Sequence, residues 1–366
     1  MFLSKLDSLK EASSKIEQHQ KIMSSEVVSL GEAHKRVLAE GIKSFHDSHP
    51  FDKAAMDGFA VRAEDTFGAS KSAPKTFKIV DSIGAGVASN KTIGPNEAIV
   101  IATGSPIPEG ANAVIMKEYT ETVGDEVILS SQVTPGENVS SKAEDIKKGS
   151  VILSPKTFIR YQELGLIASA GYSEVEVYKK PRVKIIITGN ELVDPTKEEL
   201  GPAQIINSNQ YSISAMVHDS GAVAEVGRAH DTFDEVKEAI LKATEEYDVV
   251  ITTGGTAISK GDVVLDVIDE IGDMLLHGVS IRPGKAFGCG IVNDTMVFAF
   301  SGQPVAAMGQ FDMFARRYLF RMQGRDFEFD IVKKESELKI PSQLGRTFVI
   351  RTYSEDSHVK SWFWCN

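Results

Sequence analysis

The chain has 366 residues, of which 42% are hydrophobic and 25% are charged, and its formal net charge is −11. This length exceeds what one hydrophobic core normally serves, so roughly two to four domains are expected. The acidic balance disfavours nucleic acid as a partner, because binding a phosphate backbone needs clustered Lys and Arg. No run of about 18 apolar residues is present, which excludes a membrane span.

Cysteine and histidine usage excludes several kinds of site. Cys289 and Cys365 are the two cysteines, too few for a disulfide framework or a cysteine-based zinc site. The eight histidines show no metal-ligand spacing, and no nucleophile motif is present, so covalent catalysis is not indicated. The N-terminus is interrupted by charge and lacks a signal-peptide core, so we predict a cytoplasmic location.

The N-terminal half of the chain predicts an interrupted domain. Helices are expected over 7–22, 31–40 and 154–169, the last with Ser154 as its N-cap, and a strand over 173–178. From 51 to 145 the pattern changes to short strands separated by Gly, Pro and Asn, of which 76–80, 98–101 and 113–116 are the clearest. Because this β-rich module reads as an insertion, residues 1–50 and 146–180 are predicted to form one discontinuous, elongated domain.

Strands and helices alternate between residues 181 and 328, which predicts a doubly wound, mostly parallel sheet. The expected strands are 183–188, 222–226, 249–252, 286–292 and 296–300. The expected helices are one capped by 207–209 and ending near 220, 231–246, one after Asp262, and 304–322. Residues 329–366 are too short for an independent core. They are predicted to form a short C-terminal β segment with strands at 331–332, 337–340 and 347–352.

Two predicted strands of this sheet end in Thr-Gly turns. Such carboxyl ends are where α/β sheets bind ligands. Gly254 and Gly255 allow close approach of a ligand to the backbone, and free N–H groups there can hold a phosphate. Asp262 offers a hard oxygen for magnesium beside that phosphate. Glu191 follows the other turn and is expected on the same edge, either facing the ligand or serving the turn alone.

A cationic turn and a serine turn extend this predicted crevice. Arg282 and Lys285 flank Pro-Gly and form a compact anion-binding arrangement in an acidic chain. Ser301 can donate a hydrogen bond, and Pro304 begins a helix whose N-terminus favours anions. Together with Asp262, these residues suit a nucleotide or phosphate ligand and a divalent cation.

Three polar residues of the β module and its boundary are weaker candidates. Asp57 precedes a glycine, Thr103 follows a strand, and Asp145 belongs to an acidic pair at a domain junction. Each also has an ordinary explanation: an Asp-Gly turn, a hydroxyl that satisfies turn amides, and a solvated charge run. Spacing alone favours these ordinary explanations.

Taken in order, the segments resemble the molybdopterin molybdenumtransferase family, the MoeA-type proteins related to the C-terminal region of gephyrin. The motifs are Asp57-Gly58, Thr103-Gly104, Gly136-Glu137-Asn138, Thr188-Gly189-Asn190-Glu191, Thr253-Gly254-Gly255, Arg282-Pro283-Gly284-Lys285 and Ser301-Gly302. The resemblance implies magnesium-dependent insertion of molybdate into adenylylated molybdopterin with release of AMP. It also implies an elongated homodimer whose site lies between the α/β domain of one subunit and the β module of the other.

The resemblance assigns roles to individual positions. The implied catalytic residues are Asp57, Thr103, Asp145, Glu191 and Asp231. The implied substrate-binding residues are Gly254, Gly255, Arg282, Lys285, Ser301 and Pro304, and Asp262 is the implied Mg²⁺ ligand. Further implied partners are a molybdopterin adenylyltransferase and a molybdoenzyme chaperone. The chain departs from the family pattern at Ser140 and Ser141, where basic residues are usual, and in its short C-terminal segment.

Two other functions stay open at this point. The α/β domain is similar to molybdopterin adenylyltransferases and to related nucleotide hydrolases, but neither explains Asp57 and Thr103 in a β module. A non-catalytic molybdopterin-binding scaffold is the second. The acids retained at Asp57, Asp145, Glu191, Asp231 and Asp262 argue against a degenerate site.

Overall fold

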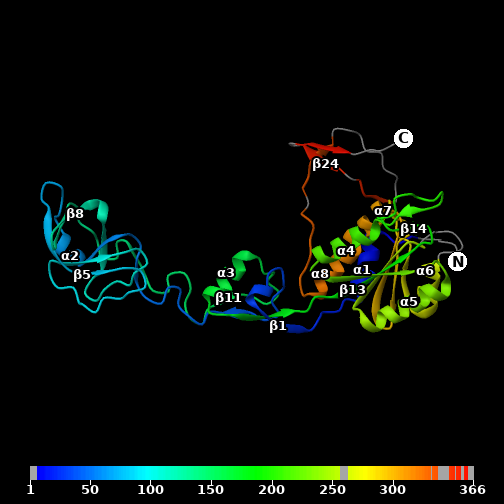
Figure 1. Ribbon diagram of the computed structural model, residues 1–366, viewed down its shortest axis with the longest axis horizontal. Coiled ribbons are helices and arrows are strands. Elements are labelled where there is room, and N and C mark those ends of the chain that lie inside the picture. The colour runs from blue at the N-terminus through cyan, green and yellow to red at the C-terminus, as the bar shows by residue number, and fades with distance from the viewer. Residues whose placement is uncertain are drawn as a thin grey trace.

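The computed structural model describes residues 6–255, 263–330, 332–336, 346–350, 352–355 and 358–361. The molecule is elongated, with a β module at one end, an α/β domain at the other and a narrow connecting region between them (Figure 1). Each end is built around a six-stranded sheet. The predicted multidomain α/β fold class is confirmed.

The sheet of the α/β domain has the strand order β16-β13-β17-β21-β20-β18. The first four strands are parallel: β16 (Val223–Ala229), β13 (Arg182–Thr188), β17 (Val249–Thr253) and β21 (Thr295–Phe300). The other two, β20 (Gly288–Val292) and β18 (Asp273–His277), pair antiparallel. Strand β18 was not predicted, because its apolar run, 274–276, is only three residues long and only Leu276 in it is fully buried.

Helices cover both faces of this sheet (Figure 1). One face carries α1 (Leu9–Glu17), α4 (Asn209–Asp219), α7 (Pro304–Gln310) and α8 (Arg316–Met322). The other carries α5 (Phe233–Glu246) and α6 (Val263–Ile271). In β13, Ile185 and Ile187 join the first core and Ile186 joins the second. Burial on both faces explains why this strand is continuously apolar.

The last helix is interrupted where a single helix was predicted. A π-helical turn, η3 (Phe311–Ala315), separates α7 from α8. Such turns carry one extra residue and are frequent near functional sites. Phe311 and Phe314 from this turn are buried, and the Phe314 ring stacks on Phe287 with centroids 4.2 Å apart. The turn therefore fits the helix to an aromatic core.

The connecting region brings together segments from before and after the β module. Strand β1 (Ser25–Ser29) pairs antiparallel with β12 (Glu174–Tyr178), and β2 (Ile42–Lys43) pairs with β11 (Val151–Leu153). Helix α3 (Tyr161–Ser169) packs on these strands through a shared apolar core. The predicted domain boundaries stay a prediction, but helix α1 packs on the α/β domain and not on this region.

Three predicted helices differ from the structure. The first ends at Glu17, five residues early, and the 31–40 segment contains only a 3-10 turn, η1 (Leu30–Glu32). The helix expected from Ser154 begins at Tyr161. The 31–40 segment and the residues just before α3 pair with each other. The Lys35 N–H donates to the Ile159 carbonyl oxygen at 2.8 Å, and the Ile159 N–H donates to the Arg36 carbonyl oxygen at 2.9 Å. Backbone groups used in this pairing are lost to a helix, so long-range contacts override the local pattern.

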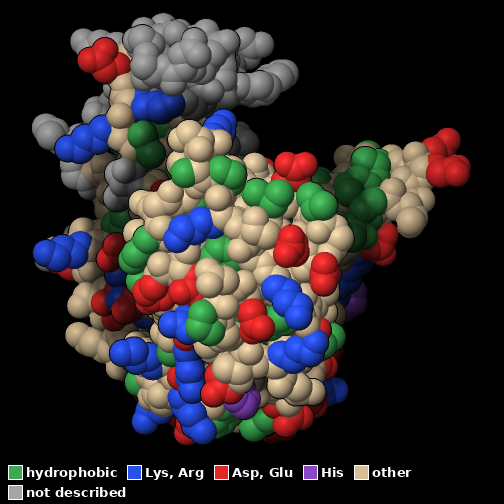
Figure 2. Space-filling model, turned by 90° about the vertical axis from the view of Figure 1, so that its left-hand side faces the viewer, with side chains coloured by type: hydrophobic (Ala, Val, Ile, Leu, Met, Phe, Trp, Pro, Cys, Tyr) green, Lys and Arg blue, Asp and Glu red, His purple; other side chains and the backbone are tan. Residues whose placement is uncertain are grey.

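The sheet of the β module has the order β7-β4-β6-β5-β9-β8. Its strands are β4 (Gly58–Val61), β5 (Lys75–Ile83), β6 (Glu97–Ile101), β7 (Ala113–Met116), β8 (Thr120–Val123) and β9 (Glu126–Leu129), and α2 (Ala63–Thr66) follows β4. Near the connecting region, β3 (Lys53–Ala54) pairs with β10 (Val139–Ser140). Seen from this end of the molecule, acidic and basic side chains are interspersed (Figure 2).

Short strands complete the fold. Strands β14 (Leu192–Val193) and β15 (Ile205–Ile206) pair with each other, and β23 (Thr347–Phe348) pairs with β19 (Ile281–Arg282). Strands β22 (Glu335–Ser336), β24 (Thr352–Glu355) and β25 (His358–Ser361) form a three-stranded sheet. The predicted strand at 337–340 lies outside the described residues, and Val332 is not in a strand. Within the described ranges, no helix has the length and apolarity needed to cross a membrane.

Candidate functional site

Asp57 and Thr103 meet at one edge of the β module. Asp57 precedes β4, and Thr103 follows β6, its antiparallel neighbour. The Thr103 N–H and hydroxyl both donate to Asp57 Oδ1, at 2.8 and 2.6 Å. Gly58 sets this geometry, because a Cβ there would lie 1.9 Å from the Ile115 carbonyl oxygen. The two predicted residues therefore form one unit.

The Asp57 carboxylate is half exposed and faces an open depression of about 460 Å³. Lys117 shares this depression, with its Nζ 3.9 Å from Asp57 Oδ2. The hydrogen bonds from Thr103 lower the pKa of Asp57 below its ordinary value of 3.8, and Lys117 adds a smaller effect in the same direction. Asp57 is therefore a stable anion at neutral pH, able to accept hydrogen bonds or to bind a cation.

Thr103→Val is expected to raise the pKa of Asp57 towards 3.8, because it removes the hydroxyl donor and leaves the backbone N–H. The lowered pKa contributes stability that is present above pH 3.8 and is lost as the pH falls through the folded value. Carbon NMR titration of the Asp57 carboxyl measures the change. Thr122→Val, in the wall of the same depression, is the control. An unchanged Asp57 pKa in Thr103→Val would contradict the assigned role of the hydroxyl.

A second group of predicted residues gathers where β13 and β17 end. Gly254 and Gly255 have φ values of +101° and +63°. A Cβ on Gly254 would lie 2.1 Å from the Thr188 carbonyl oxygen, and one on Gly255 would lie 3.0 Å from Asp231 Oδ1. The glycine turn thus lies directly against the end of β13 and the Asp231 carboxylate. This close approach requires glycine.

Glu191 lies at the same edge of the sheet. Its carboxylate folds back over Gly189, where a Cβ would lie 2.9 Å from Glu191 Oε1. Between the two acids, Asn190 Oδ1 accepts the Asp231 N–H at 3.4 Å. An open depression of about 520 Å³ lies beside them. The structure therefore brings Glu191, Asp231 and the glycine turn together.

The acids at this edge fit a hard divalent cation. Mg²⁺ takes carboxylate oxygens and is commonly bound by one or two of them together with phosphate oxygens. Asp231 supplies such oxygens directly beside the glycine turn, and Glu191 supplies them at the end of the neighbouring strand. Asp262, the predicted ligand, lies outside the described residues. In the ranges that the structure describes, no group of three or more potential metal-ligating side chains is present.

The cationic turn and the serine turn are joined by a residue that the sequence did not reveal. Gln310, at the end of α7, is fully buried. Its Nε2 donates to the Gly284 carbonyl oxygen at 2.8 Å, and its Oε1 accepts the Ser301 N–H at 2.8 Å. The side chain thereby fixes the turn of Arg282 and Lys285 relative to Ser301. A polar residue within an apolar helix stripe was the signal that could have revealed it.

Gln310→Leu is expected to lower the free energy of unfolding by about 1–3 kcal/mol, because it leaves the partly buried Ser301 N–H and Gly284 C=O unpaired. Urea denaturation measures the loss. Gln303→Leu is the matched control, since the Gln303 side chain is exposed at the start of the same helix. Equal stability of the two variants would show that Gln310 does not brace the turns.

The remaining predicted residues are less closely joined to these groups. The Asp145 N–H donates to the Ser48 carbonyl oxygen at 3.3 Å, at the boundary of the β module, and its side chain is exposed. Pro304 is the first residue of α7, as expected, and Ser301 Oγ accepts the Gln303 N–H at 3.4 Å. Arg282 also lies near the C-terminal segment, with its guanidinium 6.0 Å from the centre of the Phe348 ring.

The two groups lie at opposite ends of the molecule. The β module carries the Asp57–Thr103 pair, and the α/β domain carries the sheet edge (Figure 1). A single chain in this conformation does not bring them together. Any site that uses both groups must therefore take one of them from a second chain.

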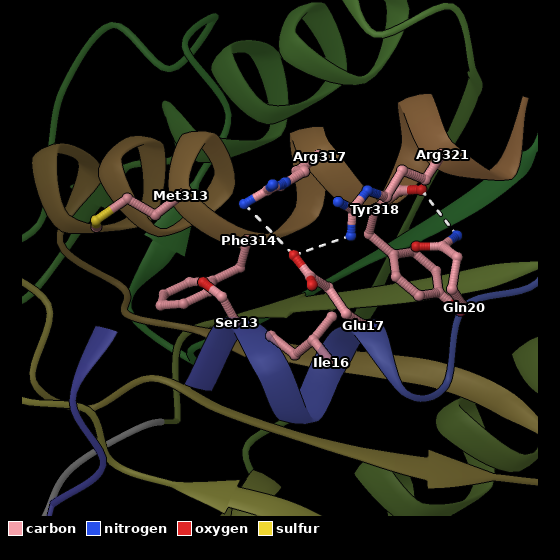
Figure 3. Close-up of a pocket in the computed structure, with 9 residues that line it drawn as sticks. All are labelled: Ser13, Ile16, Glu17, Gln20, Met313, Phe314, Arg317, Tyr318 and Arg321. Atoms are coloured by element: carbon pink, nitrogen blue, oxygen red, sulfur yellow. Dashed lines mark hydrogen bonds and ion pairs between the residues drawn. The ribbon is translucent and has the colours of Figure 1, made fainter. Parts of the chain in front are cut away.

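Another pocket lies between α1 and the last helix, away from the predicted residues. Figure 3 shows Glu17 of α1 pointing between Arg317 and Arg321. Its Oε1 is 3.4 Å from Arg317 and 2.9 Å from Arg321. Gln20 Nε2 also donates to the Tyr318 carbonyl oxygen at 3.2 Å. These contacts hold α1 on the α/β domain.

Comparisons with known proteins agree with this architecture. Residues 7–171 match the MoeA N-terminal region (domain I and II), and residues 184–321 match a probable molybdopterin binding domain. A putative molybdopterin biosynthesis protein of Methanocaldococcus jannaschii is 39% identical, over 88% of this chain and 79% of that protein. The molybdopterin molybdenumtransferase of Bacillus subtilis is 37% identical, over 84% of this chain and 72% of that protein.

A solved structure gives the same result. The crystal structure of the molybdopterin biosynthesis moeA protein from Pyrococcus horikoshii aligns with a TM-score of 0.85 at 34% identity. The alignment covers 98% of this chain and 90% of that one. The sequence similarity and the shared fold extend over both ends of the molecule. This chain therefore belongs to the MoeA family of molybdopterin biosynthesis proteins.

Proposed function

We propose that this protein is a molybdopterin molybdenumtransferase, an enzyme that inserts molybdate into adenylylated molybdopterin and releases AMP. The observation that carries the proposal is the sheet edge where a glycine turn, two carboxylates, two cations and a serine turn meet. Relatives that are 37% and 35% identical to this chain over the aligned residues bear this enzyme name. A role in molybdenum cofactor biosynthesis follows from the family.

Different residues of the sheet edge bind the phosphates and the molybdate. The Gly254-Gly255 turn offers backbone N–H groups to the phosphates that link the pterin to AMP. Arg282 and Lys285 attract molybdate, a dianion, within a chain whose net charge is −11. Gln310 fixes the position of the turn that carries these cations relative to Ser301. Oxyanion and nucleotide are thereby held side by side on one rigid edge.

We further propose that magnesium serves the reaction. Asp231 and Glu191, with Asp262, would hold the ion near the phosphates, where it supplies positive charge to the departing AMP. Asp231 is held against Gly255 and, through its N–H, against Asn190. These contacts place Asp231 beside the glycine turn before any ligand binds.

The proposed enzyme acts as a homodimer. Asp57 and Thr103 lie far from the sheet edge within one chain (Figure 1). A closed two-fold dimer can place each β module against the sheet edge of its neighbour and create two equivalent sites. Contacts with a molybdopterin adenylyltransferase or a molybdoenzyme chaperone, and a cytoplasmic location, remain predictions from the sequence.

Release of AMP tests this function. Purified protein is incubated with adenylylated molybdopterin, molybdate and Mg²⁺, and AMP and molybdenum cofactor are quantified. Production of both in equal amounts is expected. Tight binding of molybdopterin without AMP release would favour the non-catalytic scaffold. Formation of adenylylated molybdopterin from ATP would favour an adenylyltransferase, and hydrolysis of unrelated nucleotides would favour a nucleotide hydrolase.

A further inference from the structure

Asn209 is a buried polar residue that the sequence indicated only as part of a helix cap. It is the first residue of α4 and is only 6% exposed. Its Nδ2 donates to Thr253 Oγ1 at 3.1 Å and to the Gly302 carbonyl oxygen at 2.9 Å. One side chain therefore ties the N-terminus of α4 to the end of β17 and to the turn after β21.

These contacts fix the orientation of the amide group. A backbone carbonyl oxygen only accepts hydrogen bonds, so the nitrogen of the Asn209 amide must face Gly302. Both N–H groups of that nitrogen are then used. The remaining atom, Oδ1, is buried, and no donor in the described part of the chain reaches it. Buried acceptors are nearly always paired, so an unpaired one at this position calls for a partner.

Asn209 lies between the two turns that the proposed function assigns to the ligand. The glycine turn continues directly from Thr253, and the serine turn contains Gly302. The two turns are in contact, because a Cβ on Gly302 would lie 3.4 Å from the Gly254 Cα atom. The amide group that bears the unpaired oxygen is thus held between the two turns.

We propose that Asn209 Oδ1 accepts a hydrogen bond from an N–H or O–H group of the ligand bound at this edge. The inference rests on the proposed function and adds a recognition residue to it. Molybdate is a dianion without a hydrogen-bond donor at neutral pH, whereas the pterin ring carries N–H groups and the ribose of AMP carries hydroxyls. Asn209 therefore recognises the organic part of the substrate and not the oxyanion.

Calorimetry on folded variants with three separate probes tests this role. Asn209→Ala is expected to weaken binding of molybdopterin or of AMP about tenfold, and to change molybdate binding by less than about twofold. Loss confined to molybdopterin assigns the donor to the pterin, and loss confined to AMP assigns it to the nucleotide. Asn209→Ser, which shortens the side chain but keeps a hydroxyl donor, carries the same expectation if the alanine variant does not fold.

Asn207→Ala is the matched control. Asn207 is a buried asparagine two residues earlier, and both its amide atoms are paired with Gln210, at 3.0 and 3.3 Å. Its loss removes a local cap and should leave the affinity for every probe within about twofold. The proposal would be overturned if Asn207→Ala weakened binding of molybdopterin or AMP as much as Asn209→Ala does. It would also be overturned if Asn209→Ala weakened molybdate binding as much as it weakens binding of the organic probes, because Asn209 would then have only a structural role.

The two proposals fail in different ways. Wild-type protein that binds molybdopterin or AMP through Asn209 but releases no AMP from the adenylylated substrate rejects the enzyme and keeps the recognition residue. Normal turnover together with unchanged affinities in Asn209→Ala rejects the recognition residue and keeps the enzyme.

Discussion

Mixing inactive Asp57→Ala protein with inactive Asp231→Ala protein is expected to restore up to about a quarter of wild-type turnover. The physical reason is that Asp57 belongs to the β module and Asp231 to the α/β domain, which lie at opposite ends of one elongated chain (Figure 1). After random subunit exchange, half of the dimers are mixed. Each mixed dimer carries one site with both substitutions and one site with neither, so a quarter of all sites are intact. AMP release after exchange measures the recovery.

The control mixes Asp57→Ala with Thr103→Ala protein. These residues touch in the same β module. Each substitution therefore damages the same half of the site, and every site in a mixed dimer contains one of them. No recovery is expected from this pair. No recovery from Asp57→Ala with Asp231→Ala, once exchange is demonstrated with labelled subunits, would mean that the site is built within one chain.

Arg282→Ala and Lys285→Ala are each expected to weaken molybdate binding about 10- to 100-fold, the range typical of losing a charged hydrogen bond. The two cations flank one turn, which Gln310 ties to Ser301 by donating a hydrogen bond to Gly284 and accepting one from the Ser301 N–H. Calorimetry with molybdate alone measures the loss. Residual binding in either variant should fall further as salt rises, because exposed charges are screened.

Lys237→Ala is the control for charge alone. Lys237 lies on α5, paired with Glu270 at 2.7 Å, away from the cationic turn. Its removal changes the net charge by the same amount and should leave molybdate affinity within about twofold. Wild-type affinity in both Arg282→Ala and Lys285→Ala would remove the cationic turn from the binding site.

The α/β domain was the most predictable part of this fold from sequence. Strands β17 and β21 are fully buried and β13 is largely so, which gives three mostly apolar runs, and polar-faced helices such as α5 lie between them in the sequence. The connecting region was the least predictable. There, Lys35 and Arg36 pair with Ile159, more than a hundred positions away in the chain. Local patterns carry no information about such pairing, so helices were predicted where the chain forms bridges and turns.

The candidate site was predictable where a motif marks both chemistry and backbone shape. Asp57-Gly58 and Gly254-Gly255 are of this kind, since each glycine permits a close approach that holds a polar neighbour in place. The roles of Gln310 and Asn209 escaped the sequence analysis because these residues act through long-range contacts. Gln310 reaches back to Gly284, and Asn209 reaches forward to Gly302. Neither spacing nor residue type indicates such partners before the fold is known.

The paired strands on either side of the β module have an evolutionary consequence. The chain enters and leaves the module side by side: Ser48 bridges to Ile146, and β3 pairs with β10 just inside that point. A segment whose ends are adjacent can be gained or lost in a single genetic event without displacing its flanks. A chain without the module would keep the Gly254-Gly255 turn and the cationic turn, whereas Asp57 and Thr103 would be gained or lost together with the module.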